Sequence, residues 1–255
     1  MRSPLARVIY PGASRSIGAE QLKWTLRPEE ELIWRVTARN ERIGLIIRPP
    51  SSGQNWIVFF HGNGMTLGGT AHIRHRLASA GYGVVCVEYA GYGVSSGSPS
   101  ERGCYGSADA AVAYLEQEKS VALDRVALIG WSLGSAVAID LASRRLVGAQ
   151  ILLSPLTSLF AAALDLAYLG KAAFSAGPFN SLSKAKNVDC PTLIVSGSND
   201  ALTRPWMAEA MTKAMGRRAR QVTLSGVGHN DMLGTGDRLW DSVIDFLNCP
   251  EEPER

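Results

Sequence analysis

The sequence has few of the patterns that point to a metal, a disulfide framework or a nucleic-acid partner. Its four cysteines are scattered and contain no Cys-x-x-Cys pair, so neither structural zinc nor a disulfide framework is indicated. The formal net charge is only +3. The basic run from Arg217 to Arg220 has no aromatic residues interleaved with it, and we interpret it as a solvated helix end. We therefore expect no metal, no organic cofactor and no nucleic-acid partner.

Targeting and membrane signals are also scarce. The N-terminus has no apolar stretch like that of a secretory signal, which predicts a cytoplasmic location. Residues 159–177 form an apolar segment that approaches the length of a membrane span. Its alanines, its charged Asp165 and Lys171, and its interior position argue against spanning. We expect no stable membrane insertion, and nothing in the sequence indicates an oligomeric state.

What the sequence does contain is the alternation typical of an α/β protein. Its 255 residues, 46% of them hydrophobic and 19% charged, fit a single globular domain. Short apolar runs alternate with helical patterns, which predicts a mostly parallel, eight-stranded sheet covered by helices on both faces. Residues 21–26 and 31–48 are expected to form two or three antiparallel strands, with a hairpin turn at 40–42. The other expected strands are 56–60, 83–89, 125–129, 148–153, 191–196 and 220–225. The expected helices are 65–80, 100–119, 135–145, 204–216 and 235–248.

The stretch around Ser132 has the pattern of a nucleophile elbow. An apolar strand runs through Gly130-Trp131-Ser132-Leu133-Gly134 into a helix, with no loop between them. A turn this tight exposes the serine hydroxyl at its apex and points the N-terminus of the following helix towards it. The same letters recur at residues 93–97. That copy leads into a turn and not directly into a helix, so we interpret it as a loop.

A serine nucleophile needs a base to take its proton and an acid to orient that base. His229 follows the last predicted strand in a glycine-rich loop, at the place where an elbow-type hydrolase carries its base. His72 and His75 fall within a predicted helix and are expected at the surface. His61 ends a strand and is expected to bond loop backbone.

Two carboxylates are candidates for the acid. Asp200 follows the strand at 191–196 and is preferred, because Ser132, Asp200 and His229 then have the chain order expected for this type of hydrolase. Asp231 is the alternative, although it lies only two residues from His229. The glycine-rich loop of His61-Gly62-Asn63-Gly64 lets the backbone approach a substrate closely. An amide there, paired with one after the serine, would stabilise a tetrahedral intermediate.

Four motifs together resemble the α/β-hydrolase superfamily, over a match from residue 56 to residue 247. They are HGNG at 61–64, GYGVS at 91–95, GWSLG at 130–134, and the pair GSND and GHND ending at Asp200 and Asp231. HGNG with a GYG loop and a short cap further resembles the Bem-type serine hydrolases, which include protein-depalmitoylating thioesterases. Ala90 departs from the arginine frequent in relatives, which puts in doubt any substrate contact made by that arginine.

The resemblance implies an α/β-hydrolase fold with a short cap at residues 157–187. It also implies Ser132 as nucleophile, His229 as base and Asp200 as acid, with the backbone amides of Asn63 and Leu133 as the oxyanion hole. Gly64, Tyr92 and Trp131 lie within these motifs and are candidate substrate contacts.

The predicted function is a serine hydrolase that cleaves carboxylic esters or thioesters through an acyl-enzyme, acting on a small molecule or an acylated substrate. Two alternatives stay open: a peptidase or amidase on the same triad, and a binding protein that keeps the fold without catalysis. The apolar segment at 159–177 is interpreted as either a lid over an acyl chain or a simple packing helix.

Overall fold

The computed structural model describes Tyr10, Ala13, residues 18–51, Gly53, residues 55–164 and residues 177–250. The chain divides into two compact units, Met1–Val126 and Ala127–Arg255. Most of the segment predicted as a lid, and the centre of the cap predicted at 157–187, lie outside the described residues. The single-domain organisation and the cap stay predictions.

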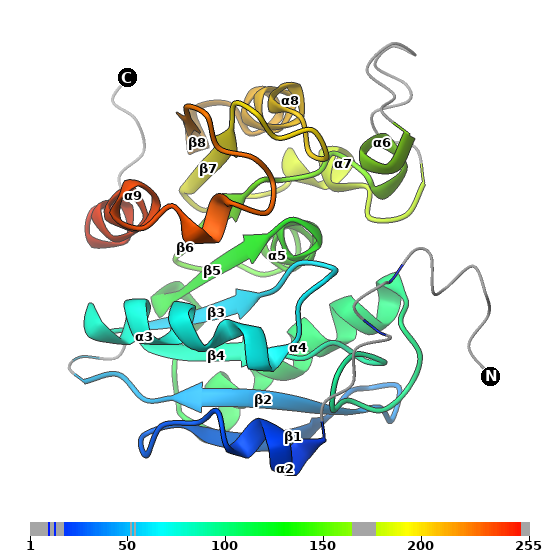
Figure 1. The fold of residues 1–255 in the computed structure, drawn as a ribbon, viewed down its shortest axis with the longest axis vertical. Helices are drawn as coiled ribbons and strands as arrows, with labels where there is room; N and C mark the ends of the chain where they lie inside the picture. The colour runs from blue at the N-terminus through cyan, green and yellow to red at the C-terminus, as the bar shows by residue number, and fades with distance from the viewer. Residues whose placement is uncertain are drawn as a thin grey trace. The chain divides into compact units, whose positions relative to one another are not determined.

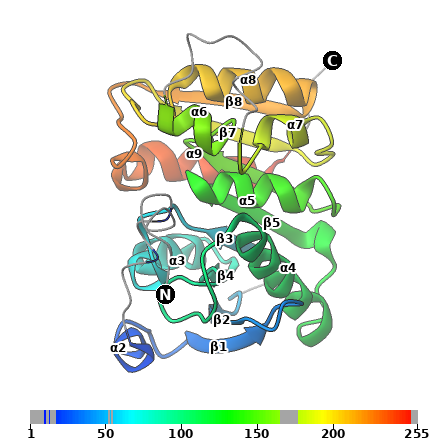
Figure 2. The ribbon, with the colours of Figure 1, turned by 90° about the vertical axis from the view of Figure 1, so that its right-hand side faces the viewer.

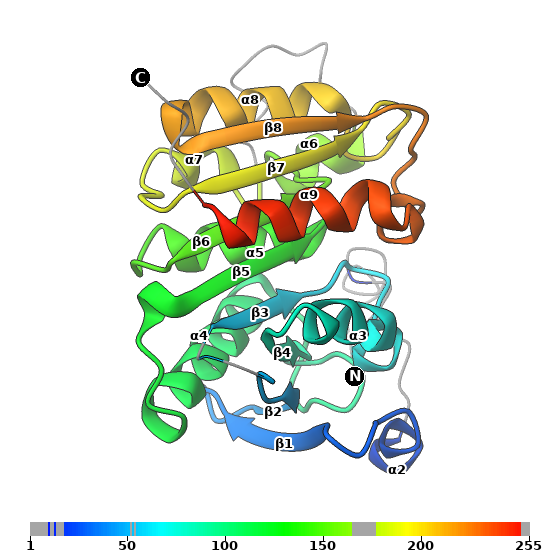
Figure 3. The same cartoon turned by 90° about the vertical axis from the view of Figure 1, so that its left-hand side faces the viewer.

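The first unit contains the antiparallel part of the structure. Its strands lie in the order β1-β2-β4-β3 (Figure 1): β1 (Glu31–Val36), β2 (Arg42–Arg48), β4 (Gly83–Val87) and β3 (Trp56–Phe60). The pairs β1–β2 and β2–β4 are antiparallel, whereas β3 and β4 are parallel. Helices α3 (Ala71–Ser79) and α4 (Glu101–Glu118) lie on opposite faces of these strands, as Figures 2 and 3 show from the two sides.

The second unit is a parallel sheet. Its strands follow chain order, each parallel to the next: β5 (Val126–Trp131), β6 (Ala149–Leu153), β7 (Thr192–Gly197) and β8 (Ala219–Leu224). Helices α5 (Leu133–Ala142) and α8 (Pro205–Met215) cover one face, and α9 (Asp237–Asn248) covers the other (Figures 2 and 3). Parallel strands end at a common edge, so the loops after β5, β7 and β8 gather there.

Local sequence explains several element boundaries. The Ser100 hydroxyl accepts a hydrogen bond from the Gly103 amide at 3.0 Å, so Ser100 caps α4 as expected. Strands β3 to β7 are apolar in both side-chain directions because they are covered on both faces, and their residues are almost all buried. In the described part of the chain, no helix has the length and apolar character needed to cross a membrane.

One predicted element was wrong, and another begins later than predicted. Residues 21–26 were expected to form a strand, but α2 (Ala19–Lys23) is a short helix followed by a turn. Alternating apolar residues suggested a strand there, yet Leu22 is buried whereas Trp24 is 88% exposed. The helix expected at 65–80 begins only at Ala71, after the 3₁₀ turn η2 (Leu67–Thr70).

A buried ion pair that the sequence did not indicate links the residue before β1 to α3. The Arg74 guanidinium donates to both carboxylate oxygens of Glu30, at 2.9 and 3.0 Å, and both side chains are almost fully buried. Arg74 also donates to the Thr70 hydroxyl at 2.6 Å. Burial by itself raises the pKa of Glu30, but the hydrogen bonds from Arg74 and the Arg27 amide outweigh it and hold that pKa below its usual value of 4.5.

Replacing Glu30 with glutamine is expected to lower the free energy of unfolding by about 3 kcal/mol at neutral pH, because it leaves the Arg74 charge buried and unpaired. Since the pKa of Glu30 is lowered on folding, its contribution is present at neutral pH and is lost as the pH falls through that lowered pKa, below the usual value of 4.5. Urea unfolding of both proteins at neutral and acidic pH checks this. A stability difference that does not shrink in acid would contradict it.

Candidate active site

The turn between β5 and α5 has the strained geometry of a nucleophile elbow. Ser132 has φ 54° and ψ −117°, a conformation that side-chain-bearing residues rarely adopt. A Cβ at Gly130 would lie 2.3 Å from the Gly134 carbonyl oxygen, so only glycine fits at this position. The Ser132 amide donates to the Leu153 carbonyl of β6 at 2.9 Å, and the Ser132 carbonyl accepts from the Ser135 hydroxyl at 2.6 Å. These contacts hold the serine at the end of the sheet.

Three side chains predicted from the sequence come together in the second unit. The His229 Nε2 atom lies 2.9 Å from Ser132 Oγ, and its Nδ1 atom lies 2.8 Å from Asp200 Oδ2. Residues 97 positions apart in sequence are therefore in hydrogen-bond contact. The His229 side chain is 11% exposed and that of Asp200 is fully buried. The imidazole can take a proton from the hydroxyl on one side while the carboxylate orients it from the other.

The carboxylate of Asp200 is held by four donors. Its Oδ1 atom accepts hydrogen bonds from the amides of Leu202 and Thr203, at 3.0 and 2.8 Å. Its Oδ2 atom accepts from the Thr203 hydroxyl at 2.9 Å and contacts the His229 ring. Burial raises the pKa of Asp200, but the bonds from His229 and Thr203 outweigh burial and bring the pKa below its usual value. Asp200 is therefore ionised at neutral pH.

Thr203 is a site residue that the sequence did not indicate. Its hydroxyl lies 2.9 Å from Asp200 Oδ2 and 3.1 Å from His229 Nδ1, so it touches both members of the pair. It comes three residues after Asp200, in the turn that follows β7. A side chain of this kind can be recognised only when the turn is folded around the carboxylate.

Replacing Thr203 with valine is expected to lower kcat about tenfold, because it removes a hydrogen bond that orients the Asp200 carboxylate towards the imidazole. It should also lower the free energy of unfolding by about 1 kcal/mol. Thr203→Ser keeps the hydroxyl and is the matched control, with kcat close to that of the parent protein. Steady-state kinetics on a p-nitrophenyl ester measures the difference, and equal kcat values for the valine and serine variants would refute the role.

The remaining predicted site residues belong to both units. Leu133 opens α5, so its amide belongs to the first turn of that helix. The Trp131 ring stacks on the His229 ring, with centroids 5.7 Å apart. In the first unit, Asn63 and Gly64 form the turn after β3. The hydroxyl of the buried Tyr92 donates a hydrogen bond to Asn63 Oδ1 at 2.7 Å.

The alternative candidates are engaged elsewhere. Asp231 accepts a hydrogen bond from the Gly228 amide through Oδ2, at 3.2 Å. Ser95, in the second copy of the elbow letters, lies in a loop as expected, and its hydroxyl bonds the Gly44 amide and the Glu88 carbonyl. His72 and His75 are exposed on α3.

The three buried thiols are poor nucleophiles. Cys86, Cys104 and Cys190 are buried, and burial raises the pKa of each, to about 11 for Cys86 and about 12 for Cys190. Thiols with such pKa values stay protonated at neutral pH. Within the described ranges, no group of three or more His, Cys, Asp or Glu side chains is arranged to hold a metal ion.

Comparison with known proteins identifies the family. Residues 57–184 match the model of the alpha/beta hydrolase family, and residues 172–255 match a second model described as TAP-like protein. The sequence is 32% identical, over 229 residues, to alpha/beta hydrolase domain-containing protein 17C of Mus musculus, with 87% of this chain and 70% of the mouse protein covered. The chain belongs to the alpha/beta hydrolase family.

Solved structures agree with this assignment at the level of the fold. An alpha-beta hydrolase from Vibrio vulnificus matches the hydrolase with a TM-score of 0.78 at 21% identity, covering 96% of this chain and 94% of that one. An esterase from Pyrococcus furiosus matches with a TM-score of 0.76 at 18% identity, covering 92% and 96%. The predicted α/β-hydrolase fold, with its mostly parallel sheet and flanking helices, is confirmed.

Proposed function

We propose that this hydrolase is a serine enzyme that cleaves carboxylic esters or thioesters through an acyl-enzyme intermediate. The observation that carries the proposal is the placement of the His229 ring, 2.9 Å from the Ser132 hydroxyl and 2.8 Å from the Asp200 carboxylate. This is the geometry that turns a weakly nucleophilic alcohol into a competent one.

In the first half of the reaction, Ser132 Oγ attacks the acyl carbon while His229 Nε2 accepts the hydroxyl proton. The tetrahedral intermediate collapses when the imidazolium returns that proton to the departing alcohol or thiol, which leaves an acyl-Ser132 ester. In the second half, His229 takes a proton from water, the hydroxide attacks the same carbon, and Ser132 recovers its proton as the acid is released. Asp200 stays ionised and stabilises the imidazolium throughout.

We propose that the backbone amides of Asn63 and Leu133 donate hydrogen bonds to the negatively charged oxygen of the tetrahedral intermediate. The amide of Leu133 follows the nucleophile directly and opens α5, so it combines a hydrogen-bond donor with the positive end of a helix dipole. Asn63 comes from the glycine-rich turn after β3. Gly64, Tyr92 and Trp131 remain candidates for substrate contacts.

Acyl esters and thioesters are favoured over amides as substrates by the resemblance to Bem-type hydrolases, a group that includes protein-depalmitoylating thioesterases. The sequence of α6 (Leu159–Leu164) is entirely apolar, and this composition favours an acyl chain or another uncharged group as its neighbour. The substrate would then be a small acylated molecule or an acylated protein.

A substrate panel tests the proposal. We expect hydrolysis of p-nitrophenyl octanoate and of an octanoyl thioester, with a p-nitroanilide of the same acyl group turned over at least about 10²-fold more slowly. Comparing acetate, octanoate and palmitate esters then measures the acyl preference. A steep preference for acetate would contradict the acyl pocket. A protein that cleaves none of these compounds and is not labelled by a fluorophosphonate would refute the proposed function.

A further inference from the structure

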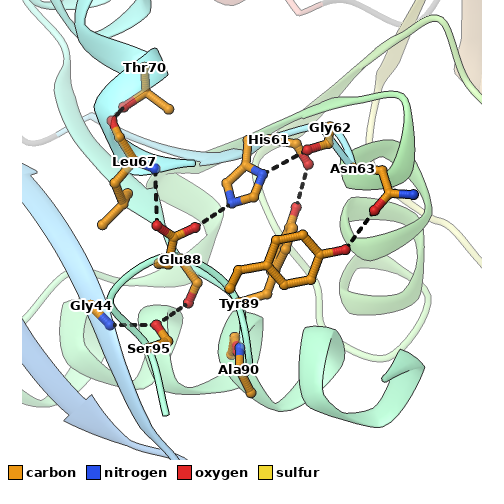
Figure 4. Close-up of polar contacts among 12 residues, drawn as sticks. Gly44, His61, Gly62, Asn63, Leu67, Thr70, Glu88, Tyr89, Ala90 and Ser95 are labelled. Carbon is orange, nitrogen blue, oxygen red and sulfur yellow. Dashed lines mark hydrogen bonds and ion pairs between the residues drawn. The ribbon is translucent and has the colours of Figure 1, made fainter. Parts of the chain in front are cut away.

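The first unit contains a buried polar cluster that the proposed chemistry does not use directly. It surrounds His61, which directly follows β3 and immediately precedes the glycine-rich turn (Figure 4). The His61 ring is fully buried, and each of its nitrogens faces an oxygen atom. Nδ1 lies 2.9 Å from the Gly62 carbonyl oxygen, and Nε2 lies 3.0 Å from Glu88 Oε1.

The contact with Gly62 fixes the position of one proton of His61. A carbonyl oxygen can only accept a hydrogen bond, so Nδ1 must carry a proton and donate it to Gly62. The Nε2–Glu88 contact is satisfied in either of two ways, by an imidazolium beside a carboxylate or by a neutral imidazole beside a carboxylic acid. In both, Nδ1–H faces the same carbonyl.

The position of Glu88 is itself tightly set. Its Oε2 atom accepts a hydrogen bond from the Leu67 amide at 3.1 Å, and its carbonyl accepts from the Ser95 hydroxyl at 3.1 Å. A Cβ at Gly93 would lie 2.0 Å from Oε2, so the carboxylate fills space that only a glycine leaves open. Figure 4 shows the carboxylate between the Leu67 amide and the His61 ring.

We infer that His61 is a positioning residue whose Nδ1–H fixes the orientation of the Gly62–Asn63 peptide. Because a trans peptide is planar, its N–H points opposite to its C=O. The hydrogen bond that holds the Gly62 carbonyl towards the imidazole therefore also fixes the direction of the Asn63 N–H, which points away from the imidazole. This inference rests on the proposed function, in which that amide stabilises the oxyanion.

The other contacts of this turn restrain the Gly62–Asn63 peptide only weakly without His61. Gly62 places little steric restraint on rotation of the peptide that follows it. The Met65 amide also donates to the Gly62 carbonyl at 3.1 Å, but this is a contact within the same turn. His61 ties the carbonyl to the sheet instead, and the Tyr89 hydroxyl ties the His61 carbonyl at 2.8 Å. Two successive peptides are thus anchored from outside the turn.

A matched pair of substitutions separates the two ring nitrogens. In His61→Asn the amide nitrogen can take the place of Nδ1 and keep the donor to Gly62, whereas in His61→Gln it takes the place of Nε2 and keeps only the contact with Glu88. With p-nitrophenyl octanoate we expect His61→Gln to lower kcat about 10²-fold, with a much smaller change in KM. His61→Asn should retain kcat within about tenfold of the parent value.

Glu88→Gln tests whether the donor or the charge matters. Its carboxamide can accept from the Leu67 amide and donate to Nε2, which keeps the proton on Nδ1. We expect kcat close to that of the parent protein. A fall as large as that of His61→Gln would assign the effect to the charged pair and overturn the inference, as would equal kcat values for His61→Asn and His61→Gln.

One measurement needs no substitution. The ¹⁵N spectrum of the unaltered protein should show the Nδ1 of His61 protonated, with a proton in slow exchange, because the ring is buried. An unprotonated Nδ1 would overturn the inference even if a variant failed to fold.

The outcomes also separate this inference from the proposed function. If the parent protein neither hydrolyses the ester nor reacts with a fluorophosphonate, the proposed function has failed. If it does both and the His61 variants behave alike, only this inference has failed.

Discussion

Replacing Ser132 with alanine is expected to lower kcat for p-nitrophenyl octanoate by at least about 10⁴-fold, because no other group occupies the apex of the elbow. Labelling by a fluorophosphonate should disappear as well, since the reagent forms its bond with Oγ. The structure should persist, because alanine differs from serine only by the hydroxyl. Intact-protein mass spectrometry after labelling, together with steady-state kinetics, measures both effects.

Ser95→Ala is the matched control for this experiment. Ser95 has the same flanking letter pattern as Ser132, but its hydroxyl bonds the Gly44 amide at 3.0 Å and the Glu88 carbonyl at 3.1 Å. We expect this variant to be labelled with the same stoichiometry as the parent protein. Labelling that survives in Ser132→Ala, or that is lost in Ser95→Ala, would show that the elbow has been assigned to the wrong serine.

Replacing Asp200 with asparagine is expected to lower kcat about 10⁴-fold, and the structure indicates how. Two backbone amides donate to Oδ1, so the amide oxygen of asparagine must stay at that position. Its NH₂ group then takes the place of Oδ2 and donates to His229 Nδ1. The neutral imidazole is left with its proton on Nε2, facing Ser132, where it cannot accept the proton of the hydroxyl.

Asp231→Asn is the control for this second experiment. Asp231 lies two residues from His229, but its Oδ2 atom bonds the Gly228 amide at 3.2 Å. We expect kcat to stay within about threefold of the parent value, because Asp231 is exposed and its carboxylate bonds the Gly228 amide. A loss in Asp231→Asn as large as that in Asp200→Asn would return Asp231 to the list of candidate acids.

Local patterns in the sequence were sufficient to locate most of the elements. The apolar runs of β3 to β7 are buried on both faces, and such runs are recognisable without knowing their neighbours. The cap at Ser100 and the tight turn at Ser132 also depend on residues a few positions apart. For the same reason the weak pattern at 21–26 was misleading: its alternation fits a strand, and only packing of Leu22 against the rest of the unit decided for a helix.

The sequence by itself determined where the hydroxyl, the imidazole and the carboxylate stand along the chain, because each follows a strand and the ends of parallel strands share one edge. Only the tertiary structure decided which groups hold them. The bridge from Thr203 to Asp200, the burial of Arg74 against Glu30, and the pairing of His61 with Glu88 depend on side-chain contacts across folded turns and between segments up to 44 residues apart. No local pattern specifies such contacts, since a buried polar group takes whichever partner the packed chain brings within reach.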